Sequence, residues 1–272
     1  MMNAVMDAAR ASLANAAPKK GDYPVNGILY CGCCNKPKEA FKTFLGQTMK
    51  VGIMCDCQEA EYHRQEAERR AQKISVNRMR AFGTDKMTKK LSQKNFANSD
   101  PTKCDPKTME IIREYADNYD TYRQEGTGIL LCGAVGTGKT YAALCILNKL
   151  LDDCHTGLFT SFSRIANDLF GLKSERGEYI YTLTNYDAVV IDDLGVERNS
   201  DWMNEQVYSV VDAFIRAEKP MIVTTNLQKE EIENATDISK QRIYSRIMGC
   251  CKPVRFVGRD LRRSNWESSN VE

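Results

Sequence analysis

Apolar residues in the second half of the chain fall in short unbroken runs, at residues 128–132, 188–191 and 221–225. Because polar residues do not alternate with apolar ones, we expect both faces of each segment to be covered, as in parallel β-strands. Residues 139–152 are apolar nearly all round, and residues 202–217 carry apolar side chains mostly at helical spacing, so both are expected to be helices. Alternating strands and helices predict an α/β fold with a doubly wound parallel sheet.

A glycine-rich loop follows the first run. Its sequence, GAVGTGKT at residues 133–140, completes the pattern GxxxxGK[ST] between an expected strand and helix, which is the context of a phosphate-binding P-loop. Glycines let backbone N–H groups approach phosphates, and the following helix points its partial positive end at the same anion. We expect Lys139 to reach the β- and γ-phosphates and Thr140 to ligate Mg²⁺. The predicted nucleotide-binding residues of this loop are Gly133, Val135, Gly136, Thr137, Gly138, Lys139 and Thr140.

Polar residues end the other two runs. Asp192 is expected to bind the nucleotide's Mg²⁺, directly or through water, and Asp193 to orient or deprotonate the attacking water. Asn226 can position that water beside the γ-phosphate. An Asp-Asp-Leu-Gly sequence also suits a solvated turn, and asparagine commonly caps strands, but the upstream P-loop favours catalytic roles. The chain has no NKxD motif for guanine, so ATP is the expected nucleotide.

Basic residues gather towards the C-terminus. Arg242 and Arg246 are four residues apart, so one face of a helix would present both. Arginines that stabilise charge on a transferring phosphoryl group can contribute about 10³–10⁵ in rate. A solvated basic face is the alternative for each of them.

Eleven cysteines point to separate chemistry near the N-terminus. A C-x2-C pair and a C-x-C pair supply four thiolates, a set that suits tetrahedral Zn²⁺. These four predicted zinc ligands are Cys31, Cys34, Cys55 and Cys57. A hairpin around Gly46 would bring the two pairs together, and Cys33 could replace Cys34 as a ligand. We expect structural zinc, with a redox pair or an iron–sulfur cluster as alternatives.

Composition is that of a globular protein, with 42% hydrophobic and 27% charged residues. The sequence contains no run of 18 apolar residues, so we expect no transmembrane helix. Charged residues in the Ala-rich N-terminus argue against a secretory signal. A hydrolase of intracellular ATP is expected in the cytoplasm. The net charge is only +2, but residues 69–94 are strongly basic. They could contact phosphates or an acidic protein surface, or form a solvated linker helix.

These patterns divide the chain into four expected parts. Residues 1–26 form a flexible arm, residues 27–98 a cysteine-rich zinc module with a basic helical linker, residues 99–265 the ATPase domain and residues 266–272 a tail.

Four segments carry a family resemblance: GILLCGAVGTGKTYAA, AVVIDDLGVE, KPMIVTTNL and QRIYSRIMGCCKPVRFVGRDLR. They resemble the AAA+ helicase loaders of bacteria and phages, the DnaC/DnaI type, and the related IstB transposition ATPase. The resemblance covers about residues 95–263 and implies an AAA+ P-loop NTPase that hydrolyses ATP. It assigns the catalytic base to Asp193 and the sensor asparagine to Asn226.

The resemblance also assigns the arginines. Arg246 matches an arginine that acts on the nucleotide of a neighbouring subunit, with Arg242 beside it, and Arg262 matches a second sensing arginine. Relatives often carry Asp where this chain has Ser245. How the arginine-bearing helix is held in place is therefore an open question.

Family members act on the hexameric replicative helicase and bind single-stranded DNA, and a cysteine-rich N-terminal module contacts the helicase in some of them. The resemblance thus implies an ATP-dependent helicase loader that is a homo-oligomer when assembled. Residues 27–98 are expected to bind the helicase. One alternative is an IstB-type transposition helper acting on a transposase, which the cysteine module argues against. The other is a nucleotide-dependent binding adaptor without useful turnover, which the intact Asp193, Asn226 and Arg246 argue against.

Overall fold

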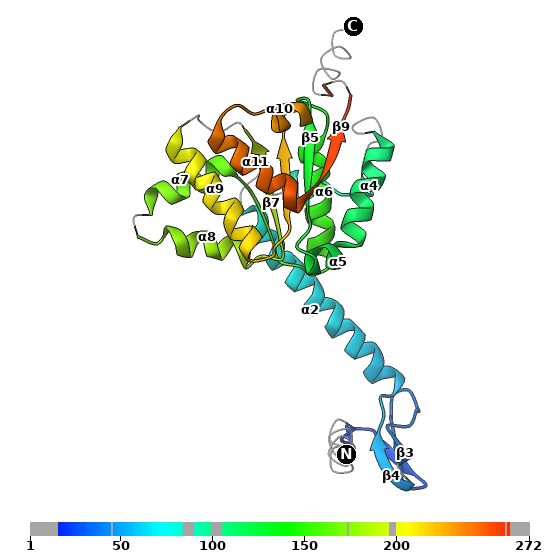
Figure 1. Ribbon diagram of the computed structural model, residues 1–272. Helices are drawn as coiled ribbons and strands as arrows, with labels where there is room; N and C mark the ends of the chain where they lie inside the picture. Colours follow the sequence, from blue (N-terminus) through cyan, green and yellow to red (C-terminus); the bar gives the residue numbers. More distant parts are fainter. Residues whose placement is uncertain are drawn as a thin grey trace. The chain divides into compact units, whose positions relative to one another are not determined.

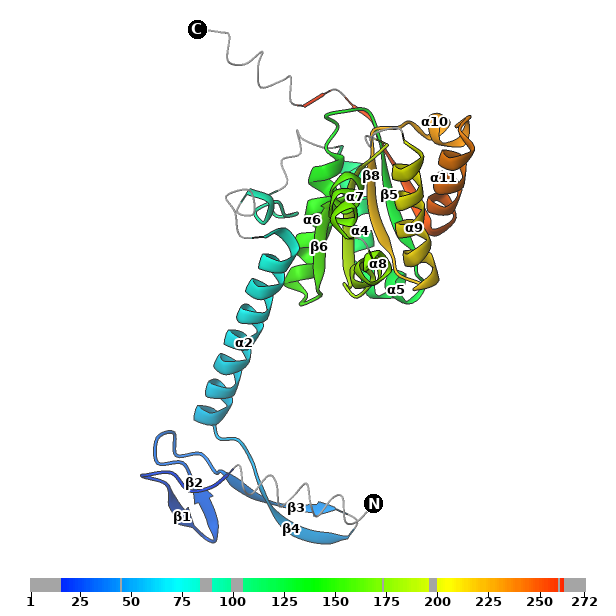
Figure 2. The same cartoon turned by 90° about the vertical axis from the view of Figure 1, so that its left-hand side faces the viewer.

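The computed structural model describes residues 16–44, 46–83, 90–98, 105–172, 174–195, 200–258 and 260–261. It contains two compact units, Met1–Gln72 and Lys73–Glu272 (Figures 1 and 2). The domain boundaries expected from the sequence stay predictions. Most of the expected N-terminal arm, the expected C-terminal tail and Arg262 lie outside the described residues.

The first unit is built from two β-hairpins. Strands β1 (Tyr23–Val25) and β2 (Ile28–Tyr30) pair antiparallel, and so do β3 (Glu39–Phe44) and β4 (Gln47–Gly52). The turn between β3 and β4 contains Gly46 at φ +78°, a backbone conformation that favours glycine. The hairpin predicted around this residue is therefore confirmed.

A buried ion pair joins the loops of this unit. Lys38 is 1% exposed, and its Nζ donates to Asp22 Oδ2 at 2.6 Å and to the Ala17 carbonyl at 2.9 Å. Asp22 Oδ1 also accepts from the Gly32 N–H at 3.1 Å. The hydrogen bond from Lys38, with those from two backbone N–H groups, lowers the pKa of Asp22 to about 2. These contacts help to stabilise a unit in which few of the described apolar side chains are buried.

Helix α2 (Asp56–Phe82) begins directly after Cys55 and ends in the second unit. Its last turns belong to the second unit, where Asn77 donates from Nδ2 to the His155 carbonyl at 2.9 Å and Arg78 pairs with Asp152. Ala81 is 2% exposed within the apolar core. No helix in the described part of the chain has both the length and the apolar character needed to span a membrane.

The second unit contains a five-stranded parallel sheet in the order β6-β7-β8-β5-β9. The three runs that the sequence predicts as strands form β5, β7 and β8, which are adjacent in the middle of the sheet. Parallel pairing brings their carboxyl ends to one edge. The strands are β5 (Gly128–Gly133), β6 (Gly157–Ser161), β7 (Ala188–Leu194), β8 (Met221–Thr225) and β9 (Cys251–Phe256).

Helices cover both faces of this sheet (Figures 1 and 2). On one side lie α4 (Pro106–Asp117), α5 (Tyr119–Gln124) and α6 (Lys139–Asp152). On the other lie α7 (Phe162–Gly171), α8 (Arg176–Thr184), α9 (Asp201–Arg216) and α11 (Ile238–Cys250), while the short α10 (Lys229–Glu233) follows β8. The predicted α/β architecture with a parallel sheet is confirmed.

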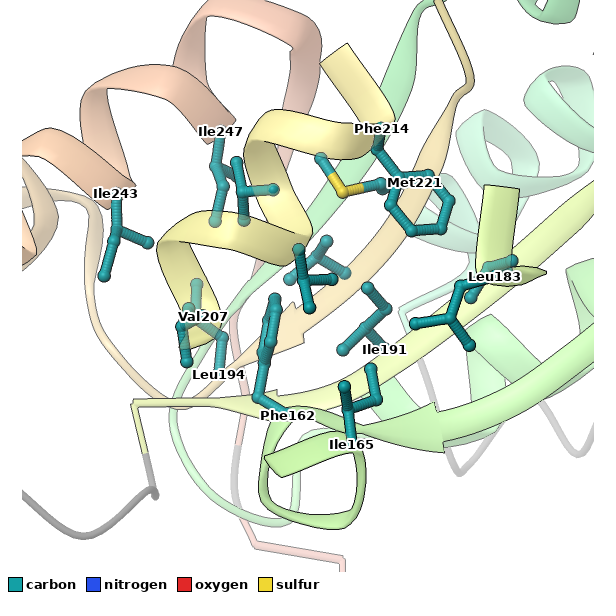
Figure 3. Close-up of a cluster of buried hydrophobic side chains, with 14 of the residues drawn as sticks. Phe162, Ile165, Leu183, Ile191, Leu194, Val207, Phe214, Met221, Ile243 and Ile247 are labelled. Carbon is teal, nitrogen blue, oxygen red and sulfur yellow. The ribbon is translucent and has the colours of Figure 1, made fainter. Parts of the chain in front are cut away.

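Successive strand residues alternate between the two apolar cores. Leu130 packs with the α9 side, whereas Ile129 and Leu131 pack with the α6 side. Figure 3 shows the α9 side, where Phe214 lies beside Met221 and Ile191 lies beneath the helices. Complete burial of side chains of this size contributes about 1.5–3 kcal/mol each, and it explains why the strands lack polar alternation.

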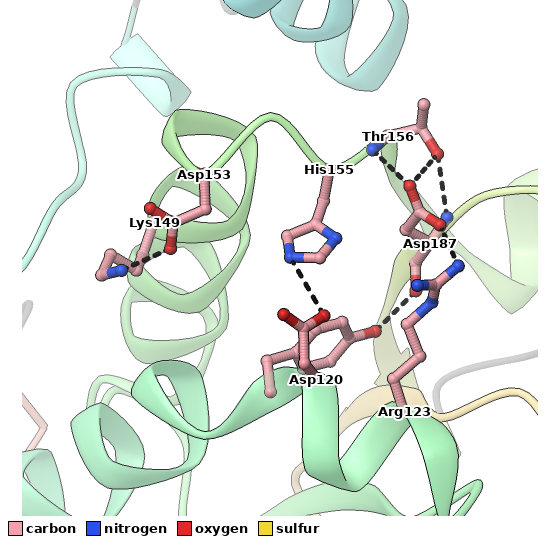
Figure 4. A network of polar contacts seen from close by, with 8 residues as sticks. Asp120, Arg123, Lys149, Asp153, His155, Thr156 and Asp187 are labelled. Atoms are coloured by element: carbon pink, nitrogen blue, oxygen red, sulfur yellow. Dashed lines mark hydrogen bonds and ion pairs between the residues drawn. The ribbon is translucent and has the colours of Figure 1, made fainter. Parts of the chain in front are cut away.

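Polar contacts join the opposite, amino-terminal end of the sheet to α5 (Figure 4). Asp187 immediately precedes β7 and accepts from the N–H and the hydroxyl of Thr156, both at 2.9 Å. Burial acts to raise the pKa of Asp187, but the hydrogen bonds from Thr156 and the nearby Arg123 lower it overall. His155 lies 3.6 Å from Asp120. The network therefore connects α5 to the loops that lead into β6 and β7.

We predict that Tyr119→Phe destabilises the second unit. Tyr119 is 2% exposed, and its hydroxyl donates to the Asp187 carbonyl at 2.6 Å. Losing a hydrogen bond of this kind costs about 0.5–1.5 kcal/mol, which lowers the melting temperature by about 1–6 °C. Tyr122→Phe is the matched control, because no hydrogen bond from the Tyr122 hydroxyl is found among the described residues. Equal melting shifts for the two variants would contradict the role of the Tyr119 bond.

Candidate nucleotide-binding site

The predicted P-loop connects the end of β5 to the start of α6. Gly136 and Gly138 have φ values of +80° and +98°, which side chains other than glycine adopt only with strain. Lys139 is 5% exposed, and its Nζ donates to the carbonyls of Gly133 at 2.8 Å and Ala134 at 2.7 Å. The loop therefore wraps around its own lysine ammonium, next to the N-terminus of α6 where an anion is favoured.

Asp192 joins the P-loop helix to two strands. Its Oδ1 accepts from the hydroxyl of Thr140 on α6 at 3.0 Å and from that of Thr224 on β8 at 2.6 Å. Burial raises the pKa of Asp192, and the neighbouring Asp193 acts in the same direction. A desolvated carboxylate beside a second carboxylate and a threonine hydroxyl is an oxygen-rich donor set that fits Mg²⁺.

Asp193 occupies a strained backbone position at the end of β7. Its φ is +58°, and the β7–β8 pairing shifts register between Ile191 and Leu194. The Asp193 N–H donates to Thr224 Oγ1 at 2.9 Å, and Asn226 Nδ2 lies 3.5 Å from Asp193 Oδ1. Irregular strand ends of this kind re-aim side chains and cluster at functional sites. Here they bring the predicted base and the predicted sensor asparagine together.

A cavity of about 410 Å³ opens at this edge of the sheet. Its volume lies within the range of about 300–1,000 Å³ that is usual for small-molecule sites. It is lined by several predicted site residues: Val135, Gly136, Gly138, Lys139, Thr140, Asp193 and Asn226. Lys94, Tyr141 and Leu261 also line it, and the sequence did not predict them. Tyr141 follows the P-loop directly, but no motif marks Lys94 or Leu261.

The two predicted arginines on α11 lie apart from this cavity. Arg246 is held by α9, because its Nη1 lies 2.8 Å from Asp212 Oδ1 and its Nη2 donates to the Tyr208 hydroxyl at 2.6 Å. The guanidinium carbon also lies 4.8 Å from the centre of the Tyr208 ring. Asp212 of α9 thus supplies the carboxylate that holds Arg246 of α11.

Arg242 is exposed, and no hydrogen bond or ion pair of its side chain is found among the described residues. It lines a second open cavity of about 500 Å³ together with Arg246, Tyr208, Gln241 and Ser245. This cavity shares no lining residue with the nucleotide cavity. The structure therefore separates the arginines from the P-loop of their own chain.

Three of the four predicted zinc ligands converge in the first unit. The sulfur atoms of Cys31, Cys34 and Cys55 all lie within 4.8 Å of one another. Zinc–sulfur bonds of about 2.3 Å in a tetrahedron would place sulfurs about 3.8 Å apart, so the spacing fits the ion. Cys57 lies beside this group, in hydrogen-bonding contact with Cys34 and Cys33.

The environment favours the thiolate form of Cys34. Its pKa is lowered to about 6, first by the hydrogen bond from the Cys57 N–H. The pKa of Cys57 is raised to about 12, chiefly by its side-chain hydrogen bond with Cys34. Cys33 is exposed and lies outside the three-sulfur group. The geometry thus groups Cys34, rather than Cys33, with Cys31 and Cys55.

We predict that Asp192→Asn stabilises the nucleotide-free protein. The raised pKa means that, at neutral pH, the ionised carboxylate is less favourable in the folded chain than in the unfolded chain. This penalty disappears as the pH falls below the ordinary aspartate pKa of about 3.9. Asparagine keeps an oxygen for Thr140 and Thr224, so each kcal/mol recovered should raise the melting temperature by about 2–4 °C at pH 7. Mg²⁺-dependent nucleotide binding should weaken in the same variant.

Asp193→Asn is the matched control for this melting experiment. Asp193 is exposed, and asparagine tolerates its positive φ equally well. The free energy of unfolding of this variant should stay within about 0.5 kcal/mol of that of the wild type. A lower melting temperature for Asp192→Asn, or an unchanged effect of Mg²⁺ on its nucleotide affinity, would contradict the assignment.

The chain is similar to several known proteins. It is 24% identical over 210 residues to the phage-like element PBSX protein XkdC of Bacillus subtilis, a match that covers 72% of each chain. It is 26% identical over 143 residues to the replicative helicase loader DnaC of Escherichia coli, covering 51% of this chain and 56% of DnaC. The matched region thus spans little more than half the length of DnaC.

The fold also has a solved counterpart in the crystal structure of DnaI. That match has a TM-score of 0.51 and 18% sequence identity, and it covers 62% of this chain and 94% of that chain. At this identity the likeness concerns the fold alone, and it confirms the predicted P-loop α/β domain. The model of the family described as IstB-like ATP binding protein matches residues 46–268, a range that includes the P-loop, both aspartates and α11. The chain therefore belongs to the IstB-like ATP-binding protein family.

Proposed function

We propose that this protein hydrolyses ATP and thereby loads a replicative helicase onto single-stranded DNA. The observation that carries the proposal is the meeting of the P-loop, Asp193 and Asn226 at one cavity, with Asp192 bonded to the P-loop residue Thr140. The relative DnaC, which is named a replicative helicase loader, supports the choice of client.

The residues around the cavity divide the work of hydrolysis. Lys139 exchanges its two carbonyl contacts for the β- and γ-phosphates of ATP. Thr140 and Asp192 hold Mg²⁺, which neutralises charge on the phosphates when bound. Asp193 takes a proton from, or orients, the attacking water, and Asn226 fixes that water from the neighbouring strand.

The arginines of α11 act on the nucleotide of a second copy, so the active assembly is a homo-oligomer. Support comes from their separation from the cavity of their own chain. Arg246 is oriented by Asp212 and Tyr208, and these contacts use only some of the five N–H donors of its guanidinium. Arg242 lies one turn away on the same helix. Arg262 keeps its predicted sensing role.

The N-terminal part, residues 27–98, binds the helicase, with its hairpins arranged around a structural zinc ion. Support comes from the converging sulfurs of Cys31, Cys34 and Cys55 and from the basic residues that follow them. The ATPase domain contacts single-stranded DNA when it is assembled with ATP. These roles place the protein in the cytoplasm.

The two alternatives fit less well. A transposition helper of the IstB type also falls within the family description, but the relative DnaC is named a replicative helicase loader, which favours the loader. A binding adaptor without turnover would not need Asp193 and Asn226 to meet beside the P-loop. Measured ATP turnover separates this adaptor from the proposed ATPase.

We predict that Arg246→Ala keeps ATP binding and loses about 10³-fold or more in hydrolysis, because it removes an arginine from the neighbour's site. Mixing it with Lys139→Ala should restore part of the ATPase rate, because some mixed interfaces combine an intact P-loop with an intact arginine. Arg216→Ala is the control, since Arg216 also pairs with Asp212 at 2.6 Å but is 81% exposed. Absence of rescue at every mixing ratio, with Arg246→Ala still inactive, would rule out action in trans.

We predict about one zinc ion per chain, and its loss in Cys55→Ser. Cys55 is 2% exposed within the three-sulfur group, so serine removes a buried ligand. Elemental analysis measures the metal, and co-elution with a purified replicative helicase measures partner binding. Both should be lost in Cys55→Ser and retained in Cys154→Ser, because Cys154 lies outside this group. Zinc-free wild-type protein, or a brown iron chromophore, would contradict the site.

A further inference from the structure

Residues 90–98 lie against the P-loop helix, and side chains of α6 hold them there. Asn148 donates from Nδ2 to the carbonyls of Leu91 at 2.9 Å and Lys94 at 2.8 Å. The Tyr141 hydroxyl lies 3.4 Å from the Asn95 carbonyl and 3.2 Å from that of Asn98. Tyr141 and Asn148 are seven residues apart, so they share one face of the helix. Two turns of α6 therefore fix the path of this segment.

Asn148 is an unusual residue for its place. It is 0% exposed, its Nδ2 also lies 3.0 Å from the Leu144 carbonyl oxygen, and its Oδ1 is buried without a partner among the described residues. An unsatisfied buried acceptor is unfavourable. The Asn148 amide is therefore poorly suited to a purely apolar core, and we infer that its role is to hold the backbone of residues 91–94.

This anchoring places Lys94 at the nucleotide cavity. Lys94 lines the cavity together with Lys139 and Thr140. The Lys94 ammonium lies 5.6 Å from the centre of the Tyr141 ring, a cation–π contact that restrains its direction. Lys94 comes from the flank of α6, whereas Asp193 and Asn226 come from the ends of β7 and β8.

We propose that Lys94 is a second nucleotide-binding lysine, which contacts the diphosphate part common to ATP and ADP. The γ-phosphate end is assigned to Lys139, Asp193 and Asn226, so a cation arriving from the flank of α6 meets the remaining phosphates. Its ammonium is a compact donor of three hydrogen bonds and suits a phosphate oxygen. The inference rests on the proposed nucleotide site.

The test is the affinity of the full-length protein for Mg²⁺·ATP and Mg²⁺·ADP, measured by calorimetry. Lys94→Ala should weaken both by a similar factor of about 10 or more, because it removes a charge-assisted contact made to either nucleotide. Lys94→Arg should recover part of the affinity. Tyr141→Phe keeps the ring and removes the hydroxyl contacts, so it should give a smaller loss for both nucleotides.

Lys90→Ala is the matched control, because Lys90 is exposed in the same segment and does not line the cavity. It should bind both nucleotides like the wild type. Affinities of Lys94→Ala within twofold of the wild type would overturn the inference, and a loss confined to ATP would overturn the diphosphate assignment. If Lys139→Ala also binds normally, the proposed nucleotide site fails as a whole. Normal binding by Lys94→Ala alone would leave that site intact.

Discussion

One half-buried carboxylate, that of Asp192, organises the nucleotide-binding site. Asp192 belongs to β7, and its Oδ1 accepts one hydrogen bond from a hydroxyl of the P-loop helix and another from a hydroxyl of β8. Its charge is costly away from water, as its raised pKa records. The two hydroxyls offset part of that cost, and a bound divalent cation would offset more. Oδ1 of Asp192 thus connects β7 with α6 and β8, and its negative charge favours a cation bound beside it.

The strained backbone beside Asp192 follows from this arrangement. With Asp192 directed towards α6, the chain shifts register against β8, and Asp193 takes a positive φ at the end of the sheet. Asp193 then faces Asn226 across adjacent strand ends. At the other end of the strands, the network around Asp187 ties α5 and the loop before β6 to the start of β7. A sheet fixed at its amino end can hold an irregular carboxyl end in place.

Sequence patterns predicted the central strands of the second unit well, because the features that specify these strands are local in the sequence. Unbroken apolar runs marked β5, β7 and β8, and the P-loop marked the start of α6. Adjacent parallel strands then required Thr140, Asp192 and Asn226 to meet at one edge. The edge strand β6 carries mixed residues in the sequence GLFTS and gave no comparable signal.

Contacts made by distant residues could not be predicted in this way. Asp212 holds Arg246 only because α9 and α11 pack together, and no spacing in the sequence marks that pair. Lys94 reaches the cavity through the anchors at Tyr141 and Asn148, so its surroundings depend on tertiary structure rather than on the basic segment that contains it. The cysteine spacing did indicate a cluster, but it predicted Cys57 as a fourth ligand, whereas the structure groups the sulfurs of Cys31, Cys34 and Cys55 and places Cys57 beside them.

In the proposed function, ATP at this site drives helicase loading onto single-stranded DNA. The most direct measurement is retention of a purified replicative helicase on closed circular DNA, in which DNA-bound helicase is separated from free helicase by gel filtration. The protein with Mg²⁺·ATP should increase helicase retention on single-stranded circles and not on duplex circles, and Lys139→Ala should not increase it on either. Equal retention with and without the protein, or loading that proceeds normally with Lys139→Ala, would contradict the proposed function.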